Sequence, residues 1–430
     1  MNALALAALL AVPGTDAEVR AAVGRIVAET DPRARAARVD DAVLLAGERP
    51  LSELVALVRQ GPPPPAEPGV AREVGGAREE LSKHGTVVVG YAFLSGGKRY
   101  RYAVDVPPGY DPKERVGLLL DPGHGTGAKS DAAGKAEFLG MWRRHADAAG
   151  GRTMLVARTE IVERIGAGGL DGERPEDEVA AVFGDFLRDV ATRFAVDPDR
   201  VYATGISQTG FWAWYLGRER ADAFAGIAPM SAVTWGADGA LANLLGLRCL
   251  VVQGAQDAIV GVVPVRATCA ELARLGGEVR YVEAERGAHD YATWGQQPEG
   301  LAWLFERTRE RHPRRVSRSL GTLASPWAHW LRVDELAKPG DGRAGTKDLA
   351  GIDGEIEGQR VRLRSSGVRA ATLALSSELV DLARPVVVEW NGKVVHEGRL
   401  EPGARALFEV LAARGDWLAT AEATLALRAP

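Results

Sequence analysis

The sequence predicts an α/β protein whose central region is a mostly parallel sheet flanked by helices. Apolar runs of strand length alternate with helical patterns from about residue 80 to residue 311, and this alternation is typical of consecutive βαβ units. Within it, a β-rich run ends in Gly205-Ile206-Ser207, and an aromatic helical run follows at once. We therefore expect a strand, a sharp turn and a helix, with a serine at the turn. The composition changes on both sides of this region, which predicts an N-terminal helical region and a small C-terminal β-rich domain.

Length and composition fit a globular protein with more than one domain. The chain has 430 residues, of which 46% are hydrophobic and 26% charged. The net charge is −4 and the two signs are interspersed, so we expect no nucleic-acid partner. Cys249 and Cys269 lack the spacing of metal ligands, and no regular histidine spacing occurs. We expect two buried free thiols, with a disulfide as the alternative, and no metal.

The N-terminal residues predict export. Residues 1–17 combine a short apolar run with a Pro-Gly break and a small residue, as in a signal peptide, and we expect a periplasmic or secreted protein. No Lys or Arg precedes the run, so a cytoplasmic location is the alternative. No other segment approaches the ~20 apolar residues of a transmembrane helix, and we expect no integral membrane segment.

Boundaries follow from composition. Residues 18–60 carry apolar side chains at helical spacing and predict amphipathic helices. Residues 61–75 form a proline-rich linker. The α/β domain is expected over 76–312, and the β-rich accessory domain over 313–430.

The α/β domain opens with a predicted antiparallel hairpin over 86–94 and 99–106. Further strands and helices then alternate. We expect strands near 116–120, 153–157, 201–206, 223–229, 247–253 and 279–283, and helices near 131–149, 176–194, 211–216, 265–275 and 298–311.

The C-terminal domain shows short strands with turn signals. Asn391-Gly392 between two β runs predicts a type I′ hairpin. A helix is expected near 404–413 and a last strand over 419–427. We expect this domain to serve in packing, oligomerisation or surface binding; the sequence does not indicate the oligomeric state.

A candidate nucleophile and its partners follow predicted strands in a fixed order. A serine becomes a nucleophile when a histidine takes its proton, and a carboxylate holds that histidine in the required tautomer. Ser207, Asp257 and His289 each follow a predicted strand. Because parallel strands end at one edge of the sheet, we predict that these residues form a catalytic triad. Asp290 and Asp238 are the rival acids.

An oxyanion hole requires backbone N–H donors. We predict the N–H of Gln208, next to the nucleophile, and a second from His124 or Gly125 in the glycine-rich loop after the strand 116–120. The same loop nearly matches a phosphate-binding P-loop, but Ala128 stands where a glycine belongs. Nucleotide binding is therefore the weaker interpretation of the loop.

Tryptophans cluster in sequence around the serine turn and the loops that follow it. Trp212 and Trp214 are expected to be core aromatics of the helix after Ser207. Trp235 and Trp294 lie in predicted loops and, with Thr209, are expected to line a substrate pocket.

Residues from about 85 to 311 resemble the esterase branch of the α/β-hydrolases, which includes polyhydroxybutyrate depolymerases, feruloyl esterases and dienelactone-hydrolase-like proteins. The motifs that carry the resemblance are Val106–Tyr110, Asp197–Gln208, Gly254–Asp257 and Gly287–His289. The resemblance implies an α/β-hydrolase fold, a triad at the serine, aspartate and histidine of these motifs, and no cofactor.

The chain departs from that family at two places. Asp121-Pro122 stands where the family usually has His-Gly, and Thr209 stands where it has glycine. The sequence predicts a serine hydrolase that cleaves a small-molecule or polymeric carboxylic ester through an acyl-enzyme. A prolyl-oligopeptidase-like serine peptidase is one alternative, and a catalytically inactive hydrolase-fold protein that binds a ligand or glycan is another.

Overall fold

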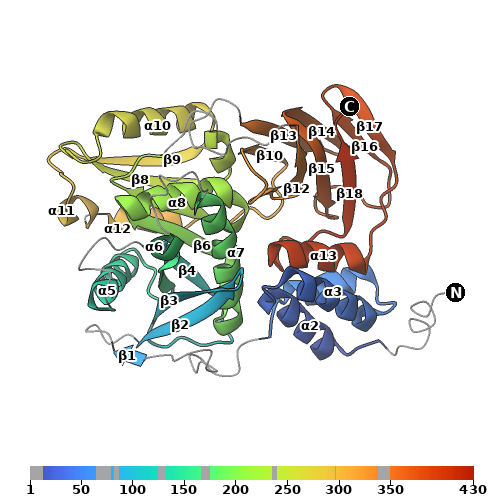
Figure 1. Ribbon diagram of the computed structural model, residues 1–430, viewed down its shortest axis with the longest axis horizontal. Coiled ribbons are helices and arrows are strands. Elements are labelled where there is room, and N and C mark those ends of the chain that lie inside the picture. Colours follow the sequence, from blue (N-terminus) through green and yellow to red (C-terminus); the bar gives the residue numbers. More distant parts are fainter. Residues whose placement is uncertain are drawn as a thin grey trace.

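The computed structural model describes residues 13–63, 79–81, 87–123, 132–165, 175–234, 240–295, 297–337 and 349–430. Most of the predicted signal peptide and most of the proline-rich linker lie outside these ranges. Figure 1 shows a central α/β region, with a helical cluster and a β-sandwich together on one side of it.

The central sheet has the strand order β1-β2-β3-β5-β4-β6-β7-β8-β9. The strands β1 to β3 are antiparallel, and β3 is also antiparallel to β5. From β5 to β9 all pairs are parallel. The bounds are β1 Glu79–Leu81, β2 Val87–Ser95, β3 Lys98–Val106, β4 Val116–Asp121, β5 Leu155–Thr159, β6 Val196–Ile206, β7 Gly226–Met230, β8 Arg248–Gly254 and β9 Glu278–Ala284.

Helices cover both faces of this sheet, so its central strands are apolar on both sides. One apolar core packs α7 (Pro175–Arg193), α8 (Gln208–Glu219) and α10 (Val262–Arg274) on one face. A second core packs α5 (Ala132–Ala148) and α12 (Pro298–Phe305) on the other. The short elements between them are α6 Ile161–Ile165, η2 Ala221–Ala223, η3 Leu241–Leu244 and α11 Tyr291–Trp294. The prediction of an α/β protein with a mostly parallel sheet is confirmed.

The C-terminal region is a β-sandwich around its own apolar core. One sheet has the order β10-β13-β14-β16-β17 and the other β11-β12-β15-β18. At the turn between β16 and β17, Asn391 and Gly392 have φ values of 49° and 80°, as the predicted type I′ turn requires. The bounds are β10 Arg315–Leu320, β11 Trp327–Ala328, β12 Leu331–Leu336, β13 Ala350–Glu357, β14 Arg360–Ser366, β15 Val368–Leu375, β16 Val386–Trp390, β17 Lys393–Gly398 and β18 Ala423–Arg428.

The N-terminal helices pack against a helix from the far end of the sequence. They are α2 (Asp16–Ala28), α3 (Pro32–Ala46) and α4 (Leu51–Arg59), and their partner is α13 (Ala404–Arg414). A Thr15–Glu18 capping box starts α2. Side chains from both ends of the chain share this apolar core, among them Val19, Val23, Ile26, Leu54, Val58, Leu407, Phe408 and Leu411. Figure 1 shows α13, in red, lying against the blue helices.

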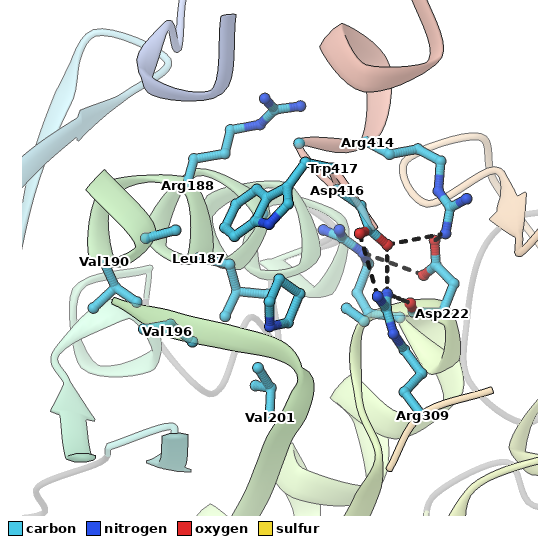
Figure 2. A pocket seen from close by; sticks show the side chains of 16 residues that line it. Leu187, Arg188, Val190, Val196, Val201, Asp222, Arg309, Arg414, Asp416 and Trp417 are labelled. Carbon is cyan, nitrogen blue, oxygen red and sulfur yellow. Dashed lines mark hydrogen bonds and ion pairs between the residues drawn. The ribbon is translucent and has the colours of Figure 1, made fainter. Parts of the chain in front are cut away.

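A buried charge network joins the end of α13 to the α/β region (Figure 2). Arg309 lies between Asp199 and Asp416, at 2.9 Å and 2.5 Å, and Arg414 pairs with Asp222 at 3.2 Å. Burial alone would raise the pKa of the Asp416 carboxyl, but Arg309 and Arg414 hold it well below its usual range. The cavity of about 60 Å³ beside this network is otherwise lined mainly by apolar side chains and by Trp417.

None of the helices in the described ranges has the length and apolar content that a membrane crossing requires.

Candidate active site

Ser207 lies at a strained turn between β6 and α8. Its backbone has φ 54° and ψ −118°, a region that a non-glycine residue enters at a cost of about 1–3 kcal/mol. Its N–H donates to the carbonyl of Met230 at 2.9 Å, and its carbonyl accepts the first helical bond of α8. A Cβ at Gly205 would overlap the backbone of Thr209, and one at Gly210 would lie 2.7 Å from the Cβ of Ala232. This strand–turn–helix has the backbone geometry of a nucleophile elbow, and it requires glycine two residues before the serine and three residues after it.

Thr209 is accommodated because its side chain turns back into the elbow. Its Oγ1 accepts the N–H of Ile206 at 2.7 Å and donates to the carbonyl of the same residue at 3.0 Å. The residue is buried. The second small residue of this elbow is therefore Gly210, one position later than in the resembled family.

Asp257 and His289 come together at the same edge of the sheet. Asp257 follows β8 and His289 follows β9, and Asp257 Oδ2 lies 2.8 Å from His289 Nδ1. The other carboxylate oxygen accepts the N–H groups of Ile259 and Val260 at 2.9 and 2.8 Å. Gln253, which the sequence analysis did not single out, donates to Asp257 from Nε2 at 3.2 Å. Burial would raise the pKa of Asp257, but the hydrogen bonds from Val260, His289 and Ile259 lower it below its ordinary value.

The rival acid Asp290 serves a local purpose. Its Oδ1 accepts the N–H and the hydroxyl of Thr293, both at 3.0 Å, at the start of α11. It is therefore occupied away from the imidazole of His289. Asp238, the other rival, lies outside the described residues.

Trp294 packs against the histidine. The two ring centroids are 5.4 Å apart, and the planes meet at 88°. The indole N–H donates to Ser231 Oγ at 2.7 Å. Ser231 is fully buried, has φ 45°, and directly follows Met230, whose carbonyl holds the Ser207 N–H. Nothing in the sequence pattern points to Ser231, because its contacts join three separate segments of the chain.

The loop after β4 starts from a buried carboxylate. Asp121 accepts the indole N–H of Trp142 at 2.8 Å and the N–H of Gly123 at 2.9 Å, and it pairs with Arg158. Gly123 has φ 73°, and a Cβ there would overlap the carbonyl of Thr159. The unusual Asp121-Pro122 thus ties the start of this loop to α5 and β5.

The predicted oxyanion donors and pocket residues are only partly described. Gln208 is the first residue of α8, where N–H groups have no acceptor within the helix. His124 and Gly125, the P-loop-like residues and Trp235 lie outside the described residues. Trp212 and Trp214 of α8 are buried in the apolar core between this helix and the sheet.

A second serine–histidine–carboxylate group lies near the junction with α4. Ser376 Oγ is 3.4 Å from His312 Nδ1, and His312 Nε2 is 2.6 Å from Glu378 Oε2. Arg59 donates to both oxygens of the Glu378 carboxylate at 3.0 Å. Ser376 is fully buried.

Other predicted features can be placed briefly. Cys249 and Cys269 are both free and buried. In the part of the chain that the structure describes, no group of three or more His, Cys, Asp or Glu side chains could hold a metal ion.

Comparisons with known proteins find similar structures but no related sequence. No protein-family model and no curated protein sequence matches the chain. A thermostable esterase has a TM-score of 0.43 and 21% identity, over 52% of this chain and 63% of that one. The strand order of the central sheet, parallel after an antiparallel start, is by itself that of an α/β-hydrolase fold. For S-formylglutathione hydrolase from Staphylococcus aureus the values are 0.39 and 16%, over 51% and 99%. For acylaminoacyl peptidase from Pyrococcus horikoshii they are 0.36 and 11%, over 53% and 46%. The chain thus spans less than two thirds of the esterase and less than half of the peptidase.

Proposed function

We propose that this protein is a serine hydrolase that cleaves a carboxylic ester through an acyl-enzyme. The observation that carries the proposal is a strained serine at a strand–helix turn on the sheet edge where Asp257 and His289 are paired at 2.8 Å. A buried, hydrogen-bonded aspartate next to a histidine at that edge has the chemistry of a general-base pair. The substrate is a small-molecule or polymeric ester.

The roles of the three residues follow from the hydrogen bond between Asp257 and His289. Asp257 occupies Nδ1 of His289, so Nε2 is left as the nitrogen that takes the proton of Ser207. Ser207 attacks the ester carbonyl, and His289 then returns the proton to the departing alcohol. Water then attacks the acyl-enzyme while His289 takes a proton from it. His289 returns that proton to Ser207 Oγ as the acid leaves. Asp257 stays ionised throughout and stabilises the imidazolium that forms in each step.

Negative charge develops on the carbonyl oxygen during both steps. We assign one donor to the N–H of Gln208, since it belongs to the first turn of α8 and follows the nucleophile directly. The second donor is assigned to His124 or Gly125 in the loop that begins at Asp121.

The test is labelling with a fluorophosphonate probe, which forms a covalent bond with an activated serine. We expect the wild type to be labelled and Ser207→Ala to lose all labelling. Ser376→Ala is the matched control, because Ser376 also lies beside a histidine, and it should label like the wild type. A folded wild type that the probe does not label would contradict the proposal and favour a binding protein.

A second measurement separates ester from peptide chemistry. We expect turnover of a short-chain nitrophenyl ester and none of a peptide anilide. Turnover of the anilide at a similar kcat/KM would assign the site to a peptidase instead.

A further inference from the structure

Thr209 closes a small ring around the centre of the proposed site. Its hydroxyl holds both backbone polar groups of Ile206, accepting from the N–H at 2.7 Å and donating to the carbonyl at 3.0 Å. The two residues inside this ring are Ser207 and Gln208. These are the proposed nucleophile and the proposed first oxyanion donor.

The ring acts on backbone that is otherwise strained and crowded. Ser207 has a positive φ, and Gly205 leaves no room for a side chain against the Thr209 backbone. Thr209 is buried, so water does not readily replace its hydroxyl as the partner of Ile206. Glycine, which the resembled esterases have at this position, has no side chain that could make either bond.

The direction of two functional groups depends on this turn. The Ser207 hydroxyl must point at the substrate carbonyl, and the Gln208 N–H must point at the oxygen that becomes negative. A change in the backbone angles of Ser207 or Gln208 turns the Gln208 N–H relative to the Ser207 side chain. A bond that fixes Ile206 to Thr209 therefore restricts the geometry of nucleophile and oxyanion donor together.

We propose that Thr209 is a positioning residue for acyl transfer, and that its hydroxyl keeps Ser207 and Gln208 aligned for the reaction. This inference rests on the proposed function, since it assumes that Ser207 is the nucleophile. It also assigns Thr209 a role inside the elbow rather than at the surface of a substrate pocket.

The test compares variants that keep or lose the hydroxyl. Thr209→Val and Thr209→Ala lose it, while Thr209→Ser keeps it. The matched control is Thr204→Val: Thr204 is also buried in β6, but its hydroxyl donates to the carbonyl of Ala228 on the next strand at 3.0 Å. For each protein, kcat and KM on a nitrophenyl ester are measured per active site titrated with the fluorophosphonate, together with Tm.

We expect Thr209→Val and Thr209→Ala to lower kcat per titrated site by roughly 10-fold or more with KM within about twofold, since part of an oxyanion-hole contribution is lost. Thr209→Ser should recover most of the rate. Thr204→Val should lower Tm without changing kcat.

Three results would overturn the inference. The first is a kcat per titrated site for Thr209→Val and Thr209→Ala equal to that of the wild type, even with a lower Tm. The second is an equal loss of kcat in Thr204→Val, and the third is a Thr209→Ser as slow as Thr209→Ala. Because Thr209→Ala removes atoms without adding any, it replaces Thr209→Val if that variant does not fold. A wild type that the probe does not label would defeat the proposed function itself, which distinguishes the two failures.

Discussion

Two groups of serine, histidine and carboxylate in this chain have opposite patterns of burial. In the proposed triad the carboxylate is inaccessible to water. The side chain of Asp257 is 0% exposed and that of His289 is 14% exposed. In the second group the serine is inaccessible, because Ser376 is 0% exposed, while the side chain of Glu378 is 42% exposed. The same residue types are thus placed in reverse order from interior to solvent.

This difference separates the proposed reactive group from a group with a structural role. A substrate has to reach the serine, and the imidazolium needs an ionised carboxylate that water does not screen. Glu378 is exposed and already shared with Arg59. Burial lowers the pKa of His312 to about 4; Glu378 opposes this shift, while Arg59 and Arg414 add to it. A neutral histidine with a buried serine on one side stabilises a junction and offers no site to a substrate.

The largest expected change in kcat comes from replacing the two carboxylates in turn. Asp257→Asn should lower kcat by about 10⁴-fold, because the amide favours the wrong tautomer of the histidine. Glu378→Gln should leave kcat within about twofold and lower Tm slightly, since it weakens a partly exposed ion pair. Both are measured by ester hydrolysis per titrated site. Similar losses in the two variants would remove the distinction between the groups.

A smaller effect is expected from the tryptophan that supports His289. Trp294→Phe keeps a ring near the imidazole but loses the bond to Ser231, and we expect kcat to fall about 10-fold, as for a mispositioned general base. Ser231→Ala removes only the acceptor of this bond, and we expect a smaller decrease in kcat. If KM rises instead, with kcat unchanged, Trp294 contacts substrate and does not position the histidine.

The smallest expected effect concerns His329, a half-buried histidine near the aspartates and arginines of the charge network. Burial lowers its pKa to about 3, with Arg414 and Arg309 contributing and Asp222 opposing. The unfolded chain therefore binds a proton at this histidine below about pH 6.5, while the folded chain does not. The contribution of His329 to the free energy of unfolding is therefore fully present above about pH 6.5 and is lost as the pH falls toward 3.

The variant His329→Asn tests this, because asparagine tolerates the positive φ of 52° found there. Urea unfolding between pH 7.5 and 5 should show a smaller loss of free energy of unfolding for His329→Asn than for the wild type. That range lies above the pH at which carboxylates such as Asp416 begin to titrate in the unfolded chain. Parallel curves for the two proteins would show that His329 does not contribute.

Much of the fold could be predicted from local pattern, and the reason is physical. Alternation of apolar runs with helical periodicity is a short-range property, and parallel strands must end at one edge of their sheet. This is enough to expect Asp257 and His289 at the edge where Ser207 also lies, and the structure brings Asp257 and His289 into contact there.

What sequence could not provide are contacts between distant segments. The sequence predicts Trp294 in a substrate pocket but does not indicate its partners: the indole bonds Ser231 and packs against His289. Helix 404–413 was expected within a β-rich domain, but its apolar side chains contact the helices near residue 20. In each case the partner is set by packing, which no local pattern encodes.

The packing of α13 on α2, α3 and α4 also bears on how the chain folds during synthesis. During synthesis the N-terminal helices leave the ribosome long before α13. The whole central sheet and most of the sandwich are translated between them. Until then the apolar side chains that α13 covers, such as Val23 and Val58, lack their final partner. Contacts so distant in sequence form slowly, and exposed apolar surface favours association with other chains. We therefore expect these first helices to be a target for chaperones that hold nascent chains.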